Sequence, residues 1–393
     1  MDYISCWFYK GAQFIEKYGA NLAFVSTNSI CQGEQVSLFW PHILEKMNVE
    51  IAFSYQSFKW TNNAKSNAGV TCVIVGLRPK SKKSKYIYNG STKTEVININ
   101  AYLTEGNNVY IEKMLHPISQ LPKISLGSSA YDGGYLMLTK EERNTIVQLY
   151  PEANELIKRF VGSEEFIQGK ERYCLWIEDK QLEKARSIPI IMERLKKVSA
   201  FRNKSDRKLT KETAKIPHVF AENRHQSKPS IIIPIVSSEH RKYYTCGFLT
   251  GSEVIPNSAR AIYDAKPYIF GILSSLMHMV WVKAVSGQLE TRIRYSAGVC
   301  YNAFPIPKLT EKVKDTITSY VFRIIGERER YSEKTIADLY DSERMPISLR
   351  EAHAGLDEVI ERCYRSKPFE SDDERLKYLF KLYEEMIIKD KNA

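Results

Sequence analysis

Two aromatic residues, Phe58 and Trp60, stand beside a polar loop in the stretch FSYQSFKWTNNAKSNAGVTCVIVGL, residues 53–77. The loop is rich in Lys, Asn and Ser, and strand-like runs flank it. Aromatic rings next to amide and ammonium groups can form a pocket for a flat polar ring such as a nucleobase. The same pattern also fits a hairpin whose aromatic side chains cap a hydrophobic core. These residues alone leave both interpretations open.

Basic residues form a second group with possible chemistry. The chain carries a net charge of +11, and residues 194–242 contain 13 basic and 4 acidic residues. Such a local excess is expected where a protein contacts a polyanion. Within residues 196–215, Ser and Thr separate the cations, which suits contacts to phosphates, although a solvated loop is the alternative. The candidates are Arg202, Lys204, Arg207, Lys208 and Lys211.

The segment VSSEHRKYY has the side chains that read base edges in DNA. Arg and Lys can hydrogen-bond guanine, and Ser can bond to either base type. The candidates are Ser237, Ser238, His240, Arg241 and Lys242. Two other polar residues favour structural roles, because His278 lies in an apolar helix and Asp132 precedes two glycines in a turn-like sequence.

Composition describes the scaffold that must position these residues. A chain of 393 residues with 43% hydrophobic and 26% charged residues predicts two or three globular domains. The seven cysteines are scattered singly without a metal-binding pattern, which predicts reduced thiols in a cytoplasmic protein. The longest apolar stretch, residues 268–282, is shorter than the ~20 residues that a bilayer needs. We therefore expect a buried helix there and no membrane partner.

The first segment has an α/β pattern. It predicts a helix over 3–18, a strand over 20–29, a helix near 36–47, and two further strands over 49–55 and 69–78. Helices that alternate with apolar runs indicate a mostly parallel sheet. The last two strands should pair antiparallel because their connection is too short for a crossover helix. Residues 22–26 would then form an exposed sheet edge.

The rest of the chain divides into a mixed segment and a helical tail. Turns, a helix over 139–160 and β-rich pieces such as SIIIPIVSS indicate an α+β module, and the sequence FPIPK ends it. Three segments after Leu309 have the spacing of amphipathic helices, and Ser371 fits the start of the last one. The predicted domains are 1–116, 117–307 and 308–393.

Five blocks of this sequence together resemble the C-terminal part of the MmeI-like adenine-N6 DNA methyltransferases of type IIL restriction-modification systems. The blocks are AFVSTNSICQGEQV, SFKWTNNAKSNAGVTCVIVG, GSEEFIQGKERYCLWI, MHMVWVKAVSGQLETRIRYSAGVCYNAFPIP and LREAHAGLDEVIERCY. The resemblance covers essentially the whole chain. It implies the second half of a Rossmann-like class I methyltransferase sheet, then an α+β target recognition domain, then a helical C-terminal domain.

Two motifs that the family uses for methyl transfer do not occur in this sequence. A Gly-rich turn after the first strand lets the backbone approach S-adenosylmethionine, and an Asp or Asn followed by Pro-Pro and an aromatic holds the adenine amine. The chain has no Pro-Pro dipeptide, and neither Gly133-Gly134 nor Gly247 and Gly251 follow such a strand. The resemblance thus implies S-adenosylmethionine as the cofactor, but we expect neither its site nor the catalytic residues in this chain.

The resemblance also favours a base pocket over a core-capping hairpin. In that family an aromatic residue between the last two strands stacks on the flipped adenine, and Phe58 or Trp60 occupies this place. We therefore expect double-stranded DNA as a partner, with a separate chain that carries the first half of the methyltransferase. The alternatives are a stand-alone DNA-binding specificity subunit without catalysis, or an inactive remnant.

Overall fold

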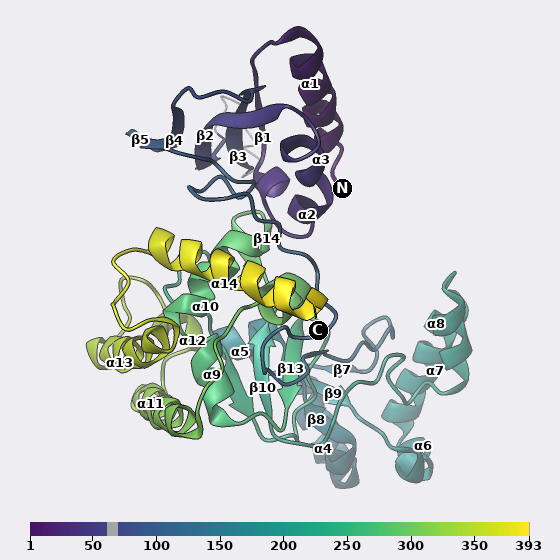
Figure 1. Cartoon of the computed structure of the whole chain (residues 1–393). Helices are drawn as coiled ribbons and strands as arrows, with labels where there is room; N and C mark the ends of the chain where they lie inside the picture. Colours follow the sequence, from purple (N-terminus) through teal and green to yellow (C-terminus); the bar gives the residue numbers. More distant parts are fainter. Residues whose placement is uncertain (61–69, 393) are drawn as a thin grey trace.

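The first part of the chain is a five-stranded sheet with helices packed on one face (Figure 1). The structure is a computed structural model that describes residues 1–60 and 70–392, so most of the predicted Asn-rich loop lies outside the described residues. The helices are α1 (Ile4–Tyr18), α2 (Gln35–Phe39) and α3 (Pro41–Leu44). The strands are β1 (Leu22–Thr27), β2 (Val49–Lys59), β3 (Thr71–Pro79), β4 (Lys85–Asn89) and β5 (Thr92–Val96).

The strand order is β1-β3-β2-β4-β5. The prediction of a mostly parallel sheet was wrong for the pairings, since only β2 and β4 pair in parallel. The reason is that β3 lies between β1 and β2 and runs antiparallel to both, so these two strands share a direction without touching. The predicted antiparallel pair of β2 and β3 is confirmed, and so is the position of β1 at an edge of the sheet.

The single helix predicted near residues 36–47 is divided into α2 and α3. Pro41 begins α3, because its ring fixes φ and it has no N–H to continue the preceding helix. Trp40 joins the two helices and is fully buried, with its Nε1 donating to Ile30 O at 2.7 Å. The two short helices therefore still cover the sheet as one layer.

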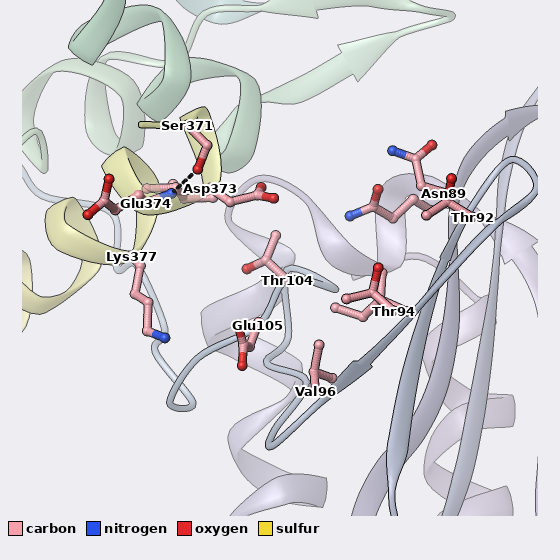
Figure 2. Close-up of a pocket in the computed structure, with 13 residues that line it drawn as sticks. Asn89, Thr92, Thr94, Val96, Thr104, Glu105, Ser371, Asp373, Glu374 and Lys377 are labelled. Carbon is pink, nitrogen blue, oxygen red and sulfur yellow. Dashed lines mark hydrogen bonds between the residues drawn. The ribbon is translucent and has the colours of Figure 1, made fainter. Parts of the chain in front are cut away.

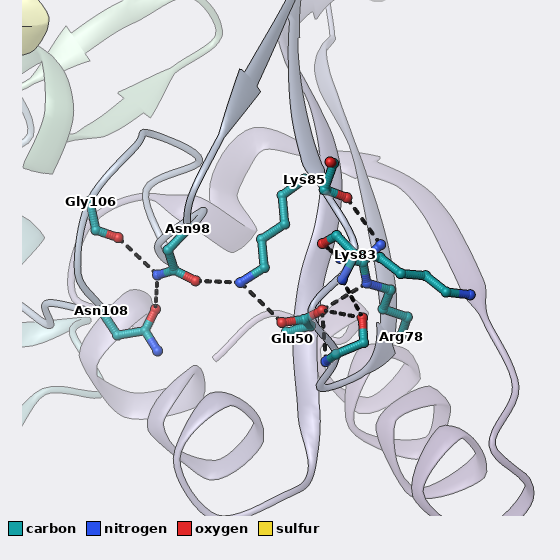
Figure 3. A network of polar contacts seen from close by, with 9 residues as sticks. Glu50, Arg78, Lys83, Lys85, Asn98, Gly106 and Asn108 are labelled. Atoms are coloured by element: carbon teal, nitrogen blue, oxygen red, sulfur yellow. Dashed lines mark hydrogen bonds and ion pairs between the residues drawn. The ribbon is translucent and has the colours of Figure 1, made fainter.

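A polar network fastens the end of this sheet that lies away from Phe58 (Figure 3). Glu50 of β2 pairs with Arg78 of β3 at 2.7 Å and with Lys85 of β4 at 3.0 Å. Lys85 Nζ also donates to Asn98 Oδ1 at 2.7 Å, and Asn98 Nδ2 donates to Gly106 O. Burial alone would raise the pKa of Glu50, but the hydrogen bonds from Arg78 and Lys85 hold that pKa below its usual value. The network thus fixes the register of three strands.

The second part is α+β, as predicted. Its helices are α4 (Lys140–Leu149), α5 (Ser163–Gln168), α6 (Leu182–Ser187), α7 (Pro189–Asn203), α8 (Lys208–Glu212), α9 (Pro267–Leu273) and α10 (Leu276–Val285). Its strands are β6 (Ser125–Leu126), β7 (Met137–Leu138), β8 (Ile157–Arg159), β9 (Tyr173–Leu175), β10 (Ser230–Pro234), β11 (Val236–Ser237), β12 (Gly247–Leu249), β13 (Ala259–Tyr263), β14 (Gly287–Leu289) and β15 (Arg292–Arg294). They form sheets in the orders β12-β10-β13-β6, β11-β15-β14 and β7-β9-β8.

The apolar stretch 268–282 is buried as predicted, but it forms two helices instead of one. Ser275 ends the first and caps the second, since its side chain accepts a hydrogen bond from the His278 N–H. His278 is fully buried, with its Nε2 3.0 Å from the Tyr295 hydroxyl, which confirms its structural role. Over the described residues no single helix is long and apolar enough to cross a membrane; α9 and α10 reach that length and apolarity only as a pair bent by 54°.

The predicted turn at Asp132 is also confirmed. Its carboxylate accepts a hydrogen bond from the Leu136 N–H at 2.5 Å, and Gly133 and Gly134 both have positive φ values. A carboxylate used in this way closes the turn that leads into β7.

The third part is helical, as predicted, and it packs on the other two. Its helices are α11 (Glu311–Glu329), α12 (Ile336–Leu339), α13 (Ile347–Tyr364) and α14 (Asp372–Asn392). Ser371 caps α14 by accepting from the Glu374 N–H at 3.2 Å. Phe380 of α14 lies 5.1 Å from the Tyr102 ring of the first part and 6.0 Å from the Trp281 ring of the second. One hydrophobic core therefore joins all three parts.

Candidate DNA interface

The two candidate pocket aromatics lie at the end of β2. Phe58 pairs with Cys72 of β3 next to a bulge and is half-buried. Trp60 follows the strand, its N–H donates to Val70 O at 2.8 Å, and its side chain is 45% exposed. Trp60 is therefore the aromatic ring with a free surface, whereas Phe58 is partly used in packing.

This end of β2 faces the second part of the chain. Asn28, which follows β1, donates from Nδ2 to Gln288 Oε1 of β14 at 2.5 Å. Burial alone would raise the pKa of Glu239, but a hydrogen bond from Thr291, one from its own backbone and the charges of His240 and Lys59 hold it below its usual value. Lys59 of β2 thus lies close enough to Glu239 to act on its charge, so the aromatic end of β2 and the segment 237–242 share one seam.

A cavity of about 670 Å³ lies along this seam. Ser57, the residue before Phe58, lines it, as does the buried Lys283 of α10, whose pKa is lowered by loss of solvent. Amide side chains also line it, and they can both donate to and accept from a base edge. These amides are Gln32, Gln56, Asn89 and Gln288. We name this space the amide-lined cavity.

A second pocket of about 650 Å³ lies beside the first, between the β4–β5 hairpin and the start of α14 (Figure 2). Figure 2 shows the Asn89, Thr92 and Thr94 side chains on the hairpin side and Asp373 and Glu374 on the helix side. Glu105 adds a further carboxylate to the lining. Because carboxylates repel phosphates, we assign no DNA contact to this pocket.

The structure corrects the phosphate-contact prediction for Arg202. This residue lies on the inner face of α7 and is 0% exposed. Its guanidinium donates to five backbone carbonyls, those of Ala130, Tyr131, Thr213, Ile216 and Val219, at 2.8–3.2 Å. Arg202 is therefore a structural cation that ties α7 to two neighbouring loops, and it cannot reach DNA.

The other candidates of the basic stretch lie on the surface. Lys204 follows α7, and Lys208 and Lys211 belong to α8, which projects from the molecule beside α7 (Figure 1). Arg207 is exposed but is held by Glu222 at 2.9 Å and lies over the Tyr131 ring at 5.0 Å. Three exposed lysines and one paired arginine thus remain as candidate phosphate contacts.

The segment predicted to read bases is partly buried. Ser237 is 2% exposed and Arg241 is 8% exposed, and Arg241 Nη1 donates to Ser237 Oγ at 3.1 Å. Their side chains hold the segment in shape and are not free for a base edge, so these two predictions are corrected. His240 and Lys242 are exposed, and Ser238 is half-buried. These three remain candidates.

Sequence reasoning missed two arginines next to this segment. Arg292 and Arg294 lie on β15, which pairs with β11 so that Val236 faces Arg294 and Ser237 faces Ile293. Both arginines are exposed while Ile293 is 1% exposed. The alternation Arg-Ile-Arg carries this signal, since a period of two places both cations on one face of a strand.

The described residues do not fit S-adenosylmethionine. Within residues 1–60 and 70–96, no strand is followed by a paired-glycine turn, and the turn after β1 is the buried 3₁₀ segment Asn28–Cys31. Gly133 and Gly134 lie in the second part, before β7. The same described ranges hold no group of three or more His, Cys, Asp or Glu that could bind a metal ion. We therefore derive no chemical step through a cofactor.

The fold and the seam define a class of protein: part of a DNA methyltransferase joined to a target recognition domain. Three family models match in order, the MmeI DNA-methyltransferase domain over residues 1–89, the MmeI target recognition domain over 105–308 and the MmeI C-terminal domain over 309–389. The chain belongs to the MmeI-like family of type IIL restriction-modification methyltransferases.

Two relatives give the extent of the similarity. The chain is 46% identical over 387 residues to DNA methyltransferase A of Bacillus subtilis (strain 168), which covers 98% of this chain and 44% of that protein. It matches the structure of the type IIL restriction-modification enzyme MmeI in complex with DNA with a TM-score of 0.93 and 37% identity, over 99% of this chain and 53% of that one. The chain thus spans about half the length of these relatives.

Proposed function

We propose that this chain recognises a DNA site and binds the flipped target base for an S-adenosylmethionine-dependent adenine-N6 DNA methyltransferase of a restriction-modification system. The observation that carries the proposal is the seam, where the Trp60 end of β2 meets the segment 237–242. Family membership supports it, because the matched domains are those of a methyltransferase and its target recognition domain.

Each part of the seam has a role in this proposal. Lys204, Lys208 and Lys211 neutralise phosphates, and His240, Lys242 and Ser238 lie where base edges can be reached. An extruded adenine stacks on Trp60, and the amide-lined cavity offers hydrogen bonds to its edge. The chain thus holds the target, and it does not itself transfer the methyl group.

We further propose that a separate polypeptide supplies the catalytic residues and the S-adenosylmethionine site. The poor fit of the described residues to the cofactor supports this division. It equally favours a second candidate, a stand-alone DNA-binding specificity subunit. Methyl transfer by a mixture of this chain with such a polypeptide distinguishes the two, since a specificity subunit would bind DNA without ever supporting methylation.

The experiment measures binding to a duplex with a mismatched adenine at its centre. Trp60→Ala should weaken this binding by about 1–3 kcal/mol, the contribution of one base stacked on an aromatic ring. Trp7→Ala is the matched control, because Trp7 is similarly exposed at 50% but lies on α1. Phe58→Ala is tested in parallel. If all three folded variants bind this duplex as tightly as the parent chain, the base-pocket assignment fails.

A further inference from the structure

The five-stranded sheet has one covered face and one open face. The register places Ala23, Gly76, Phe53 and Tyr86 in one row across four strands, and Val25, Ile74, Tyr55 and Tyr88 in the next row. Side chains in a row share a face, and α1, α2 and α3 pack on the opposite one, where Val73, Val75 and Leu77 of β3 are buried. On the open face Val25 is 48% exposed.

This open face is apolar and aromatic. Tyr55 and Tyr88 stack at 4.3 Å with an angle of 7° between their rings, and Phe53 lies edge-on to both. Gly76 leaves the space that the Phe53 ring fills, because a Cβ there would lie 2.1 Å from that ring. The rings therefore lie flat along the sheet as a broad surface with no helix of the described residues on top.

The edge of the same sheet is open as well. Among the described strands, β1 pairs only with β3, so the backbone N–H and C=O groups on its other side have no strand beside them. An unpaired edge bordered by Ala23 and Val25 invites pairing with another strand.

The helix beside this edge exposes a stripe of aromatic side chains. Gly11 of α1 touches β1, where an added Cβ would lie 2.8 Å from Leu22. Residues four before, three after and seven after Gly11 share its side of the helix. These are Trp7, Phe14 and Tyr18, which are 50%, 53% and 60% exposed. The stripe thus runs along the edge of the sheet, on the face opposite Val25 (Figure 1).

We infer that this edge, with the apolar surface on both of its sides, is the docking site for a second polypeptide of α/β type. Such a partner places a strand beside β1 and one helix on each face of the extended sheet. Nucleic acid does not fit, because the surface offers aliphatic groups and a strand edge in place of a row of cations.

The occupant that we assign is the catalytic half of the methyltransferase, so this inference rests on the proposed function. The methyltransferase family model ends at residue 89, and the chain spans only 44% of DNA methyltransferase A, so such relatives carry further chain that can continue the sheet.

The probe is the part of Bacillus subtilis DNA methyltransferase A that lies outside its matched region. It is mixed with the full chain, and complex formation is measured by sedimentation velocity. We expect a one-to-one complex, weakened at least about tenfold by Val25→Glu and by Trp7→Glu, since a charge in an apolar contact is left without solvent. Phe322→Glu is the matched control, because Phe322 is 61% exposed on α11, remote from the edge.

Each outcome bears on the inference. Absence of a complex, or equal loss of affinity with Phe322→Glu, overturns it. Self-association of the chain that Val25→Glu abolishes also overturns it, because the occupant would then be a second copy. Methyl transfer to unmodified DNA is measured in the same mixtures. A complex that is broken by Val25→Glu but never methylates DNA keeps the docking site and contradicts the proposed function; methylation that is insensitive to Val25→Glu does the reverse.

Discussion

The sheet of the first part and the central sheet of the second differ in how completely this chain covers them. β10 has a strand on each side and buries all five of its residues, whereas β1 has one neighbouring strand and buries one residue of six. A strand that is paired and packed on all sides is complete within its own chain. The recognition and helical parts therefore have a closed core, and the first part has a surface suited to association.

The largest expected effect is the loss of a buried contact in the closed region. Arg202→Met should lower the free energy of unfolding by about 3–5 kcal/mol, because five carbonyls lose their shared donor while remaining buried. Chemical denaturation measures this, with Lys204→Met as the matched control, expected within about 0.5 kcal/mol of the parent. Equal effects of the two substitutions would contradict the structural role of Arg202.

A pH-dependent effect should come next, from a buried carboxylate that joins the recognition part to α13. Asp357 is 8% exposed, accepts from the Tyr243 hydroxyl at 2.8 Å and accepts from the Leu276 N–H at 2.7 Å. Burial raises its pKa to about 7, although these hydrogen bonds oppose the shift.

The sign follows from proton binding in the two states. Between about pH 4, the ordinary pKa of Asp, and about pH 7 the folded chain keeps a proton on Asp357 that the unfolded chain has lost. This stabilisation is present below about pH 4 and disappears as the pH rises through about 7, at up to about 1.4 kcal/mol per pH unit. Asp357→Asn should remove that slope in denaturation midpoints measured across the window. A parent and a variant with the same pH dependence would show that Asp357 does not titrate in this range.

The exposed lysines near Arg202 should affect binding but not folding. Replacing Lys204, Lys208 and Lys211 together with Gln should flatten the dependence of log K on log salt for duplex DNA by about 2–3 units, since each phosphate contact contributes about 0.9. The free energy of unfolding should stay unchanged. A salt dependence like that of the parent would remove α8 from the DNA interface.

Much of the fold could be predicted from sequence because local patterns determine it. The helix of residues 4–18, the strands around the Asn-rich loop and the three long C-terminal helices all have clear apolar periodicity. The insertion of β3 between β1 and β2 could not be seen, since strand order depends on packing between distant segments. The break at Ser275 depends on a side chain that caps a helix start, which an apolar run conceals.

The candidate site was harder to predict because charge does not reveal exposure. Arg202 belongs to a run of basic residues, yet it follows the buried Ile191, Leu195 and Val198 at helical spacing, and that spacing places it on the inner face of α7. Arg241 has no such signal, since it is buried in a loop by contacts with another part of the chain. Exposed cations can thus be separated from structural ones where a helix supplies periodicity, and not in loops.

The smallest expected effect tests the open face itself. Val25→Thr keeps a β-branched side chain, so it should change the free energy of unfolding of the isolated chain by no more than about 0.5 kcal/mol. Ile51→Ala, on the covered face of the same sheet at 1% exposure, should cost about 2–5 kcal/mol, because it leaves a cavity in a closed core. Denaturation midpoints of the two variants, measured without any partner, make this comparison within one sheet. A cost above about 1 kcal/mol for Val25→Thr would mean that the chain covers this face by itself. A negligible cost, together with weaker docking of the second polypeptide, would show that the valine serves association and not the fold of its own chain.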